Sequence, residues 1–222
     1  MYPGGISDKQ GNRYEELWSI LHFLRVLRGD YQAITVEKLG KENDGFELHI
    51  EANDGKQQWL QSKINARGGN WTPNALKTAG VLGAFQARLR NPDCTCLFVS
   101  QDGTNLLREA CNDARVAGQL KAFKANASED RTLALETFAE ILAGENDESI
   151  AFDHMTRCYF ENASMAFLKG TLADLANFLF RSPAHAKDLA AGFLSESINR
   201  RLTTEDARNW ATDVGVLGLC GR

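Results

Sequence analysis

Three polar residues on two adjacent predicted strands have the types and spacing needed to hydrolyse a phosphodiester bond. Glu47 lies on the first strand, and Gln61 and Lys63 lie two residues apart on the second. A carboxylate can hold Mg²⁺, with Mn²⁺ as a substitute, and such an ion polarises a phosphate and lowers the pKa of water. The Gln61 amide can support the ion, while Lys63, on the same strand face, can orient the attacking water. These residues predict metal-dependent phosphodiester hydrolysis.

The register of the predicted hairpin decides which acid belongs to this site. A three-residue turn at Asn53–Gly55, with Gly55 in the left-handed conformation, places Glu47 opposite Gln61 and on the face of Lys63. A two-residue turn would instead align Asp44 with Lys63. We therefore favour Glu47 as the carboxylate ligand, with Asp44 as the alternative and Gln61 as a further ligand in either case.

The same three-residue turn separates apolar from polar positions along the hairpin. It groups Phe46, Leu48 and Ile50 on one face with Leu60 and Ile64 of the partner strand. A two-residue turn would mix apolar and polar residues on both faces. Because a buried face specifies register strongly, this pattern also favours the three-residue turn.

The elements that must position these residues follow an α-β-β-β-α-β-α order. Periodicity and turn signals predict helices over 14–27, 73–89 and 105–116, and strands over 33–38, 45–51, 57–64 and 95–100. From about residue 133 only helical spacing is evident. The sequence thus predicts an α/β fold: a three-layer core with a central mixed sheet flanked by helices over 1–125, and an all-helical C-terminal annex over 126–222.

One window of the chain has a charge opposite to the rest. Residues 55–92 contain no Asp or Glu and carry six basic side chains, whereas the whole chain has a formal net charge of −4. A basic window in an acidic protein suits a site that faces a polyanion. We expect Lys56, Arg67, Trp71 and Lys77 to contact a nucleic-acid backbone without base readout.

The remaining composition excludes several classes of protein. The chain has 222 residues, 43% of them hydrophobic, which is typical of a globular protein. No apolar run reaches the length of a membrane span, and the first residues lack the basic and apolar regions of a secretory signal. Five scattered cysteines without a CxxC pair indicate reduced thiols. We expect a cytoplasmic protein with no membrane partner.

Two short motifs resemble a known nuclease family. Gly11-x-x-Tyr14-Glu15 resembles the Gly-x-x-Phe-Glu helix start of Mrr-type restriction endonucleases, and Glu47 with Gln61-x-Lys63 resembles their Asp and Gln-x-Lys. Both motifs are typical of the PD-(D/E)xK superfamily, which has a restriction-endonuclease-like core. The chain is also similar to the double-stranded-DNA endonuclease domain at the N-terminus of bacterial anti-phage effectors, including CBASS endonuclease effectors and antiviral STAND NTPases. Glu47 departs from the Asp usual in these relatives.

The resemblance implies a Mg²⁺-dependent endonuclease acting on double-stranded DNA with little sequence specificity. It makes Glu15 a helix-borne acid near the metal. It also implies a homo-oligomer on activation, because cutting both strands needs two active sites, and further domains of a larger sensor or NTPase. Two alternatives remain: a catalytically silent nuclease-fold module for assembly or recognition, and an RNA-directed nuclease.

Overall fold

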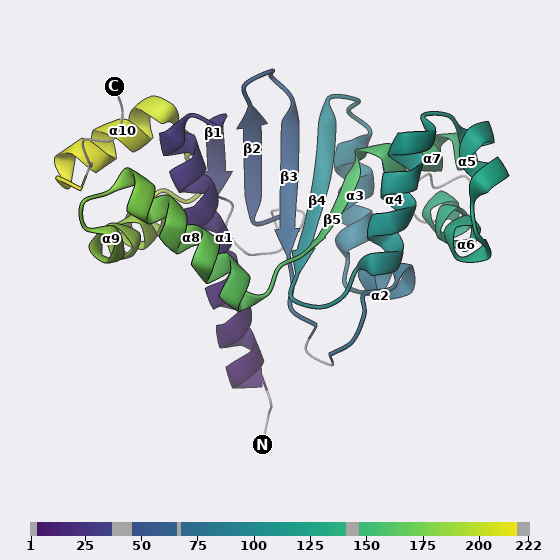
Figure 1. Cartoon of the computed structure of the whole chain (residues 1–222), viewed down its shortest axis with the longest axis horizontal. Helices are drawn as coiled ribbons and strands as arrows, with labels where there is room; N and C mark the ends of the chain where they lie inside the picture. Colours follow the sequence, from purple (N-terminus) through teal and green to yellow (C-terminus); the bar gives the residue numbers. More distant parts are fainter. Residues whose placement is uncertain (1–3, 37–45, 66–67, 141–146, 217–222) are drawn as a thin grey trace.

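A computed structural model of the chain describes residues 4–36, 46–65, 68–140 and 147–216, and side chains from residue 11 onward. The described residues form a six-stranded mixed sheet with helices on both faces (Figure 1). This arrangement confirms the predicted α/β class and three-layer core. The strands are β1 (Tyr31–Val36), β2 (Leu48–Ala52), β3 (Gln57–Ser62), β4 (Cys94–Ser100), β5 (Cys158–Asn162) and β6 (Arg201–Thr203).

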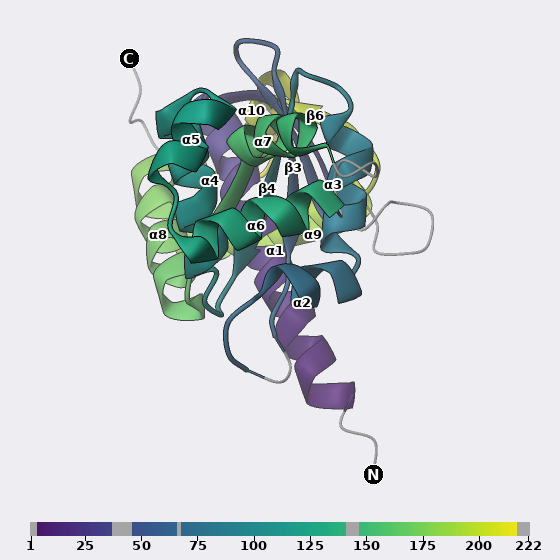
Figure 2. The ribbon, with the colours of Figure 1, turned by 90° about the vertical axis from the view of Figure 1, so that its right-hand side faces the viewer.

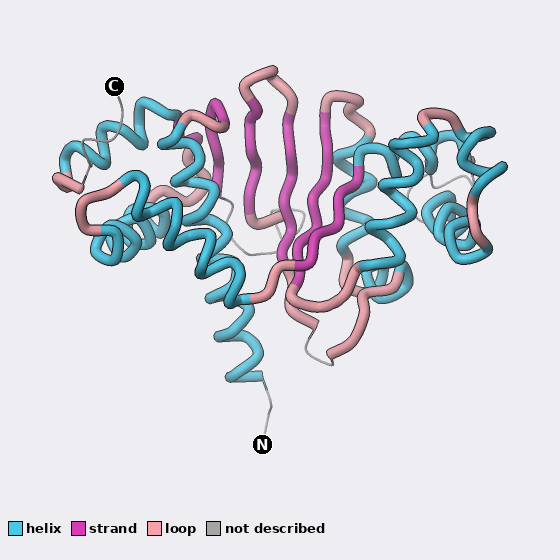
Figure 3. The backbone as a smooth tube through the Cα atoms, in the orientation of Figure 1, coloured by secondary structure: helices cyan, strands magenta, loops and turns pink. Residues whose placement is uncertain are grey.

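The sheet changes from antiparallel to parallel at β3. Its spatial order is β5-β4-β3-β2-β1-β6; β3 pairs antiparallel with β2 and parallel with β4 (Figure 3). The parallel β3–β4 connection runs through helices, as such crossovers require. These are α2 (Pro73–Thr78) and α3 (Val81–Leu89). The end of β3 therefore lies inside the sheet, between two neighbouring strands.

Helices form a separate layer on each side of the sheet. One layer consists of α1 (Gly4–Arg28), α8 (Met165–Leu179), α9 (Pro183–Glu196) and α10 (Thr204–Asp213). The other contains α2, α3, α4 (Asn105–Ala117), α5 (Leu120–Asn126), α6 (Glu129–Phe138) and α7 (Glu148–Arg157), several of which lie in front of the sheet in Figure 2. Each layer has its own core: Leu48, Leu60 and Val99 pack toward α1, whereas Trp59 and Phe98 pack toward α3. Apolar residues thus line both faces of the central strands.

The structure confirms the predicted hairpin register and corrects one face. Glu51 pairs with Gln57 and Leu48 with Leu60, and Gly55 closes the three-residue turn with φ +84°. However, Phe46 packs with the α3-side core, on the face opposite Leu48. The prediction that the two share a face is therefore wrong.

Three further predictions about elements need correction. The C-terminal segment is not all helical, because β5 and β6 come from it and pair with β4 and β1. The predicted helix over 73–89 breaks into α2 and α3 at Gly80, whose φ of +78° a helix interior does not accept. The first helix begins at Gly4, ten residues earlier than the predicted residue 14.

Candidate active site

A β-bulge at the start of β2 explains both the position of Phe46 and that of Glu47. Leu48 pairs with Leu60, and the Glu47 amide also donates to the Leu60 carbonyl, over 3.1 Å. Two consecutive residues therefore face one partner, which is the arrangement of a bulge. The extra residue turns Phe46 toward the α3 side and Glu47 toward α1.

The carboxylate of Glu47 takes the place of a backbone acceptor in the β2–β3 ladder. In a regular continuation of this register, the Ser62 amide would donate to the carbonyl of Phe46. Instead it donates to Oε2 of Glu47, over 2.7 Å. The side chain is only 5% exposed. The carboxylate is thus fixed at the point where β2 separates from β3.

Helix α1 brings a second carboxylate to the same place. Tyr14 is buried and donates its hydroxyl hydrogen to the Ala163 carbonyl over 2.8 Å, which fixes this turn of the helix beside the end of β5. The next residue, Glu15, interacts electrostatically with Glu47 and Lys63. The structure therefore places Glu15, Glu47 and Lys63, three predicted site residues from separate parts of the chain, within electrostatic reach of one another.

Burial and mutual repulsion shift both carboxyl groups toward the neutral form. Desolvation, together with the charge of Glu15, raises the pKa of Glu47 to about 8, against the opposing effects of the Ser62 amide and Lys63. Desolvation raises the pKa of Glu15 to about 7 in spite of the opposing effect of the Lys63 charge. Two close carboxylates cannot both ionise cheaply without a compensating cation.

The donor set fits a hard divalent cation. Oε2 of Glu15 and Oε1 of Gln61 are buried and have no hydrogen-bond partner among the described residues. Magnesium is commonly held by one or two carboxylates and keeps several waters. Glu15 and Glu47 supply two, although the described part of the chain contains no group of three or more His, Cys, Asp or Glu side chains suited to a metal. Asp44, the alternative ligand, lies outside the described residues.

Gln61, the predicted further ligand, directly precedes Ser62 on β3, but its side chain belongs to the other strand face. It pairs with Phe98 in the register of β3 and β4, and Phe98 belongs to the α3-side core. Glu47 is turned toward α1 by the bulge. The predicted cross-strand pairing of Glu47 with Gln61 is therefore displaced by one residue, because two residues of β2 face Leu60.

The residues predicted to contact DNA lie in different surroundings. Trp71 is 8% exposed and donates from Nε1 to Oγ of Ser100 over 2.9 Å, so its indole is a buried structural group here. Lys77 is exposed on α2, 3.7 Å from Glu140. Lys56 is exposed at the hairpin turn, at the opposite end of β3 from Lys63, and pairs with Asp54. Arg67 lies outside the described residues.

Two contributors were missed because they act on or through backbone amides. Ser62 holds Glu47 with its amide, a group that every non-proline residue carries. Asp102 accepts a hydrogen bond from the Asn65 amide over 2.7 Å and thereby fixes the chain just after Lys63. The only sequence signal for Asp102 was its place in an Asp-Gly-Thr turn, which we interpreted solely as the start of a helix.

The comparisons with known proteins support the fold. No family model matches the chain, and no curated protein matches it in sequence. Solved structures of two bacterial proteins are similar: the Moraxella osloensis Cap4 SAVED/CARF-domain containing receptor, at a TM-score of 0.57 and 12% identity, and the Acinetobacter baumannii Cap4 receptor with the cyclic trinucleotide 3'3'3'-cAAA, at 0.55 and 14%. The chain shares its fold with part of these receptors. The matches cover 90% and 91% of this chain but only 46% and 45% of the receptor chains.

No helix in the described ranges is long and apolar enough to cross a membrane.

Four cysteines in the described part, Cys94, Cys96, Cys111 and Cys158, are free and buried. Burial raises the pKa of the Cys111 thiol to about 12, which favours the unreactive neutral form. The burial of these four cysteines agrees with the expectation of core thiols.

Proposed function

We propose that the chain is a metal-dependent DNA endonuclease domain that acts as the effector of a bacterial anti-phage protein. The observation that carries the proposal is the meeting of Glu15, Glu47 and Lys63 where β2 and β3 separate, with both carboxyl pKa values raised. Residues from the two motifs that resemble nuclease motifs thus act on one another electrostatically at a partly buried position. The fold shared with part of the Cap4 receptors is consistent with this anti-phage role.

Each residue of the site has a distinct role in the proposed reaction. Glu15 and Glu47 hold the cation, and waters complete its coordination. A bound Mg²⁺ would polarise the phosphate and acidify water. Lys63 orients the attacking water and offsets the charge that builds up on the phosphate oxygens. The Ser62 amide keeps the Glu47 carboxylate in position throughout.

The proposed substrate is double-stranded DNA, cut with little sequence specificity in the cytoplasm. Backbone contacts from the basic residues 55–92 would hold the duplex, and these contacts carry no sequence information. The net charge of −4 favours weak binding by one copy. Activation through a homo-oligomer, assembled by further domains, would bring together the two sites needed to cut both strands.

Incubation with supercoiled plasmid and Mg²⁺ tests the proposal, with EDTA as the metal-free control. We expect wild-type protein to nick and linearise plasmid, and Glu47→Gln to lose this activity. Glu51→Gln is the matched control, because Glu51 lies at the far end of β2 and pairs with Arg201. No cleavage above the EDTA level, tested also at high protein concentration to promote assembly, would favour a silent recognition module. Cleavage of RNA but not plasmid would favour the RNA-directed alternative.

A further inference from the structure

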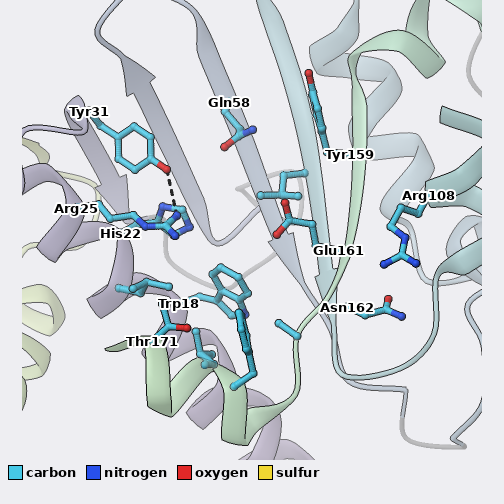
Figure 4. Close-up of a pocket in the computed structure, with 15 residues that line it drawn as sticks. Trp18, His22, Arg25, Tyr31, Gln58, Arg108, Tyr159, Glu161, Asn162 and Thr171 are labelled. Carbon is cyan, nitrogen blue, oxygen red and sulfur yellow. Dashed lines mark hydrogen bonds between the residues drawn. The ribbon is translucent and has the colours of Figure 1, made fainter. Parts of the chain in front are cut away.

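A cavity of about 540 Å³, lined by both polar and apolar side chains, lies between helix α1 and the sheet. Its walls come from five places in the chain: α1, the start of β1, the strands β3 to β5, the start of α4 and the first turns of α8. Figure 4 shows the side chains of α1 on one side, Gln58 and Glu161 on the strands, and Arg108 beyond them. Its volume lies within the range of small-molecule sites.

The cavity combines cationic and anionic groups in separate positions. Arg25 lies on the α1 side, within 3.3 Å of the Tyr31 hydroxyl, and Arg108 lies on α4. Glu161 is exposed on β5 and points into the space between them in Figure 4. His22 adds no charge, because burial lowers its pKa to about 3. A ligand that suits these walls carries an anionic group at one end and hydrogen-bond donors at another.

An exposed aromatic ring lies at the rim of this cavity. Phe167, on α8, is among the lining residues and is 65% exposed. Exposure of a large apolar ring to water is unfavourable, and a ligand that covers its flat face removes this apolar surface from water. Nucleobases stack on such rings irrespective of their sequence, because every base has a π-face.

We propose that this cavity binds a nucleotide. The base stacks on Phe167, its N–H edge donates to Glu161, and its phosphate pairs with Arg108 or Arg25. The nucleotide is either a free mononucleotide or one residue of a single strand, since both present the same chemistry. The site does not use Glu15, Glu47 or Lys63, so the inference goes beyond the proposed nuclease activity.

Calorimetric titration of the full chain in EDTA tests this inference. The Glu47→Gln variant serves as the background, so that cleavage and metal play no part. The probes are guanosine 5′-monophosphate, guanosine, and a 5′-phosphorylated single-stranded tetranucleotide. We expect saturable binding of the monophosphate or the tetranucleotide, with guanosine at least about 10-fold weaker because it lacks the phosphate. Binding of the tetranucleotide alone would assign the site to a strand.

Matched variants separate the cavity from general surface effects. Phe167→Ala should weaken binding about 10-fold through lost stacking. Phe178→Ala is its control, because Phe178 lies on the same helix, is 56% exposed and does not line this cavity. Arg108→Ala or Arg25→Ala should remove most of the advantage of the monophosphate over guanosine, whereas the exposed Arg90→Ala should not. The proposal is overturned if no probe binds saturably, or if Phe178→Ala weakens binding as much as Phe167→Ala.

The outcome is independent of the nuclease test. Nucleotide binding without metal-dependent cleavage would leave this site intact and reject the proposed catalysis. Cleavage without nucleotide binding would do the reverse.

Discussion

Lys63 is the residue whose role is most specific to catalysis. It lies directly after β3, its amide donates to the Val99 carbonyl over 3.1 Å, and its charge acts on both Glu15 and Glu47. Its backbone therefore continues the sheet, while its half-buried side chain is available to the site. A substitution that keeps the backbone should leave the fold unchanged.

We expect Lys63→Ala to slow plasmid cleavage by about 10²-fold or more, since the charge acts on the transition state. The measurement is the initial rate of nicking at saturating Mg²⁺. Lys121→Ala is a matched control, because Lys121 is an exposed residue of α5 outside the basic window. Wild-type rates for Lys63→Ala would reject its catalytic role.

The choice between the two candidate acids can be tested in the same assay. Glu47 is held by the Ser62 amide and interacts with Glu15, so Glu47→Gln should lose Mg²⁺-dependent activity more severely than Asp44→Asn. A dead Asp44→Asn variant beside an active Glu47→Gln variant would make Asp44 the main ligand.

The raised carboxyl pKa values predict an unusual pH dependence of stability. Glu47 binds its proton more tightly in the folded state, where its pKa is about 8, than in the unfolded state, where the ordinary value of 4.5 applies. The metal-free fold should therefore be most stable below pH 4.5 as far as this group is concerned, and should lose stability as the pH rises toward 8. The effect is on the order of a few kcal/mol. Urea unfolding at pH 5.5 and pH 8 measures it.

Two comparisons make this prediction specific. Glu47→Gln should reduce the loss of stability between pH 5.5 and pH 8, whereas the exposed Glu205→Gln should not. Mg²⁺ should raise Tm more at pH 8 than at pH 5.5, because ligands must be deprotonated to bind it. An equal Mg²⁺ effect at both pH values would argue against a site built from these carboxylates.

At the scale of elements, the end of β4 supports the loop that follows Lys63. Ser100 is fully buried, and its Oγ accepts the hydrogen bond from Trp71 Nε1. The Trp71 amide donates to the Gly103 carbonyl over 2.7 Å. These bonds hold the start of α2 against β4.

Ser100→Ala should leave the indole N–H of Trp71 buried without a partner, at a cost of about 1–3 kcal/mol. Ser195→Ala is the control, because its hydroxyl donates to the Gly192 carbonyl on the exposed side of α9 and its loss should change stability by less than about 0.5 kcal/mol. The free energy of unfolding in urea measures both. Equal effects of the two substitutions would mean that the Trp71–Ser100 hydrogen bond adds no measurable free energy to the stability of the fold.

The elements show which parts of the structure the sequence could predict. The hairpin register was predictable because the Asn53–Gly55 turn and the apolar pattern agree. The bulge was not, since it depends on an extra residue, Glu47, whose side chain replaces a backbone carbonyl. Strands β5 and β6 were missed because they have only 5 and 3 residues and depend on pairing with β4 and β1.

The candidate site was predictable in its members rather than in its geometry. Residue types and spacing selected Glu47 and Lys63, and the motif around Tyr14 selected Glu15. Their convergence depends on how α1 packs beside β5, where Tyr14 bonds to Ala163, nearly 150 residues away in the sequence. Local pattern carries no information about such a long-range contact. The roles of Ser62 and Asp102 were hidden because they involve backbone amides.

At the scale of the whole molecule, binding to DNA should be governed by charge. Neutralised phosphates release counterions, so affinity for a duplex should fall steeply with salt. Lys77→Glu should weaken binding to all sequences about equally and reduce the salt slope by about 1, and Arg67→Glu should do the same. Lys121→Glu and Lys187→Glu, outside the basic window, should have little effect. Titrations at two salt concentrations without metal provide the measurement.

The exposed ion pair of Lys77 with Glu140 contributes little to stability, so weaker DNA binding by Lys77→Glu should not result from unfolding. Weaker binding by the Lys121 or Lys187 variants than by the Lys77 and Arg67 variants would move the DNA-facing surface to the C-terminal helices.

Because the Ser62 amide donates to the Glu47 carboxylate, the exchange rate of this one backbone hydrogen reports on the state of the carboxylate. We expect deuterium exchange at that amide to be slowed by a side chain rather than by the neighbouring strand. Glu47→Ala should therefore speed exchange at Ser62 while the preceding amides of β3 stay slow, and Glu47→Gln, which keeps an acceptor oxygen, should preserve much of the protection. The exchange rate at this single position would then follow the carboxylate through every change of proton, cation or substrate, without any need for the protein to cut DNA.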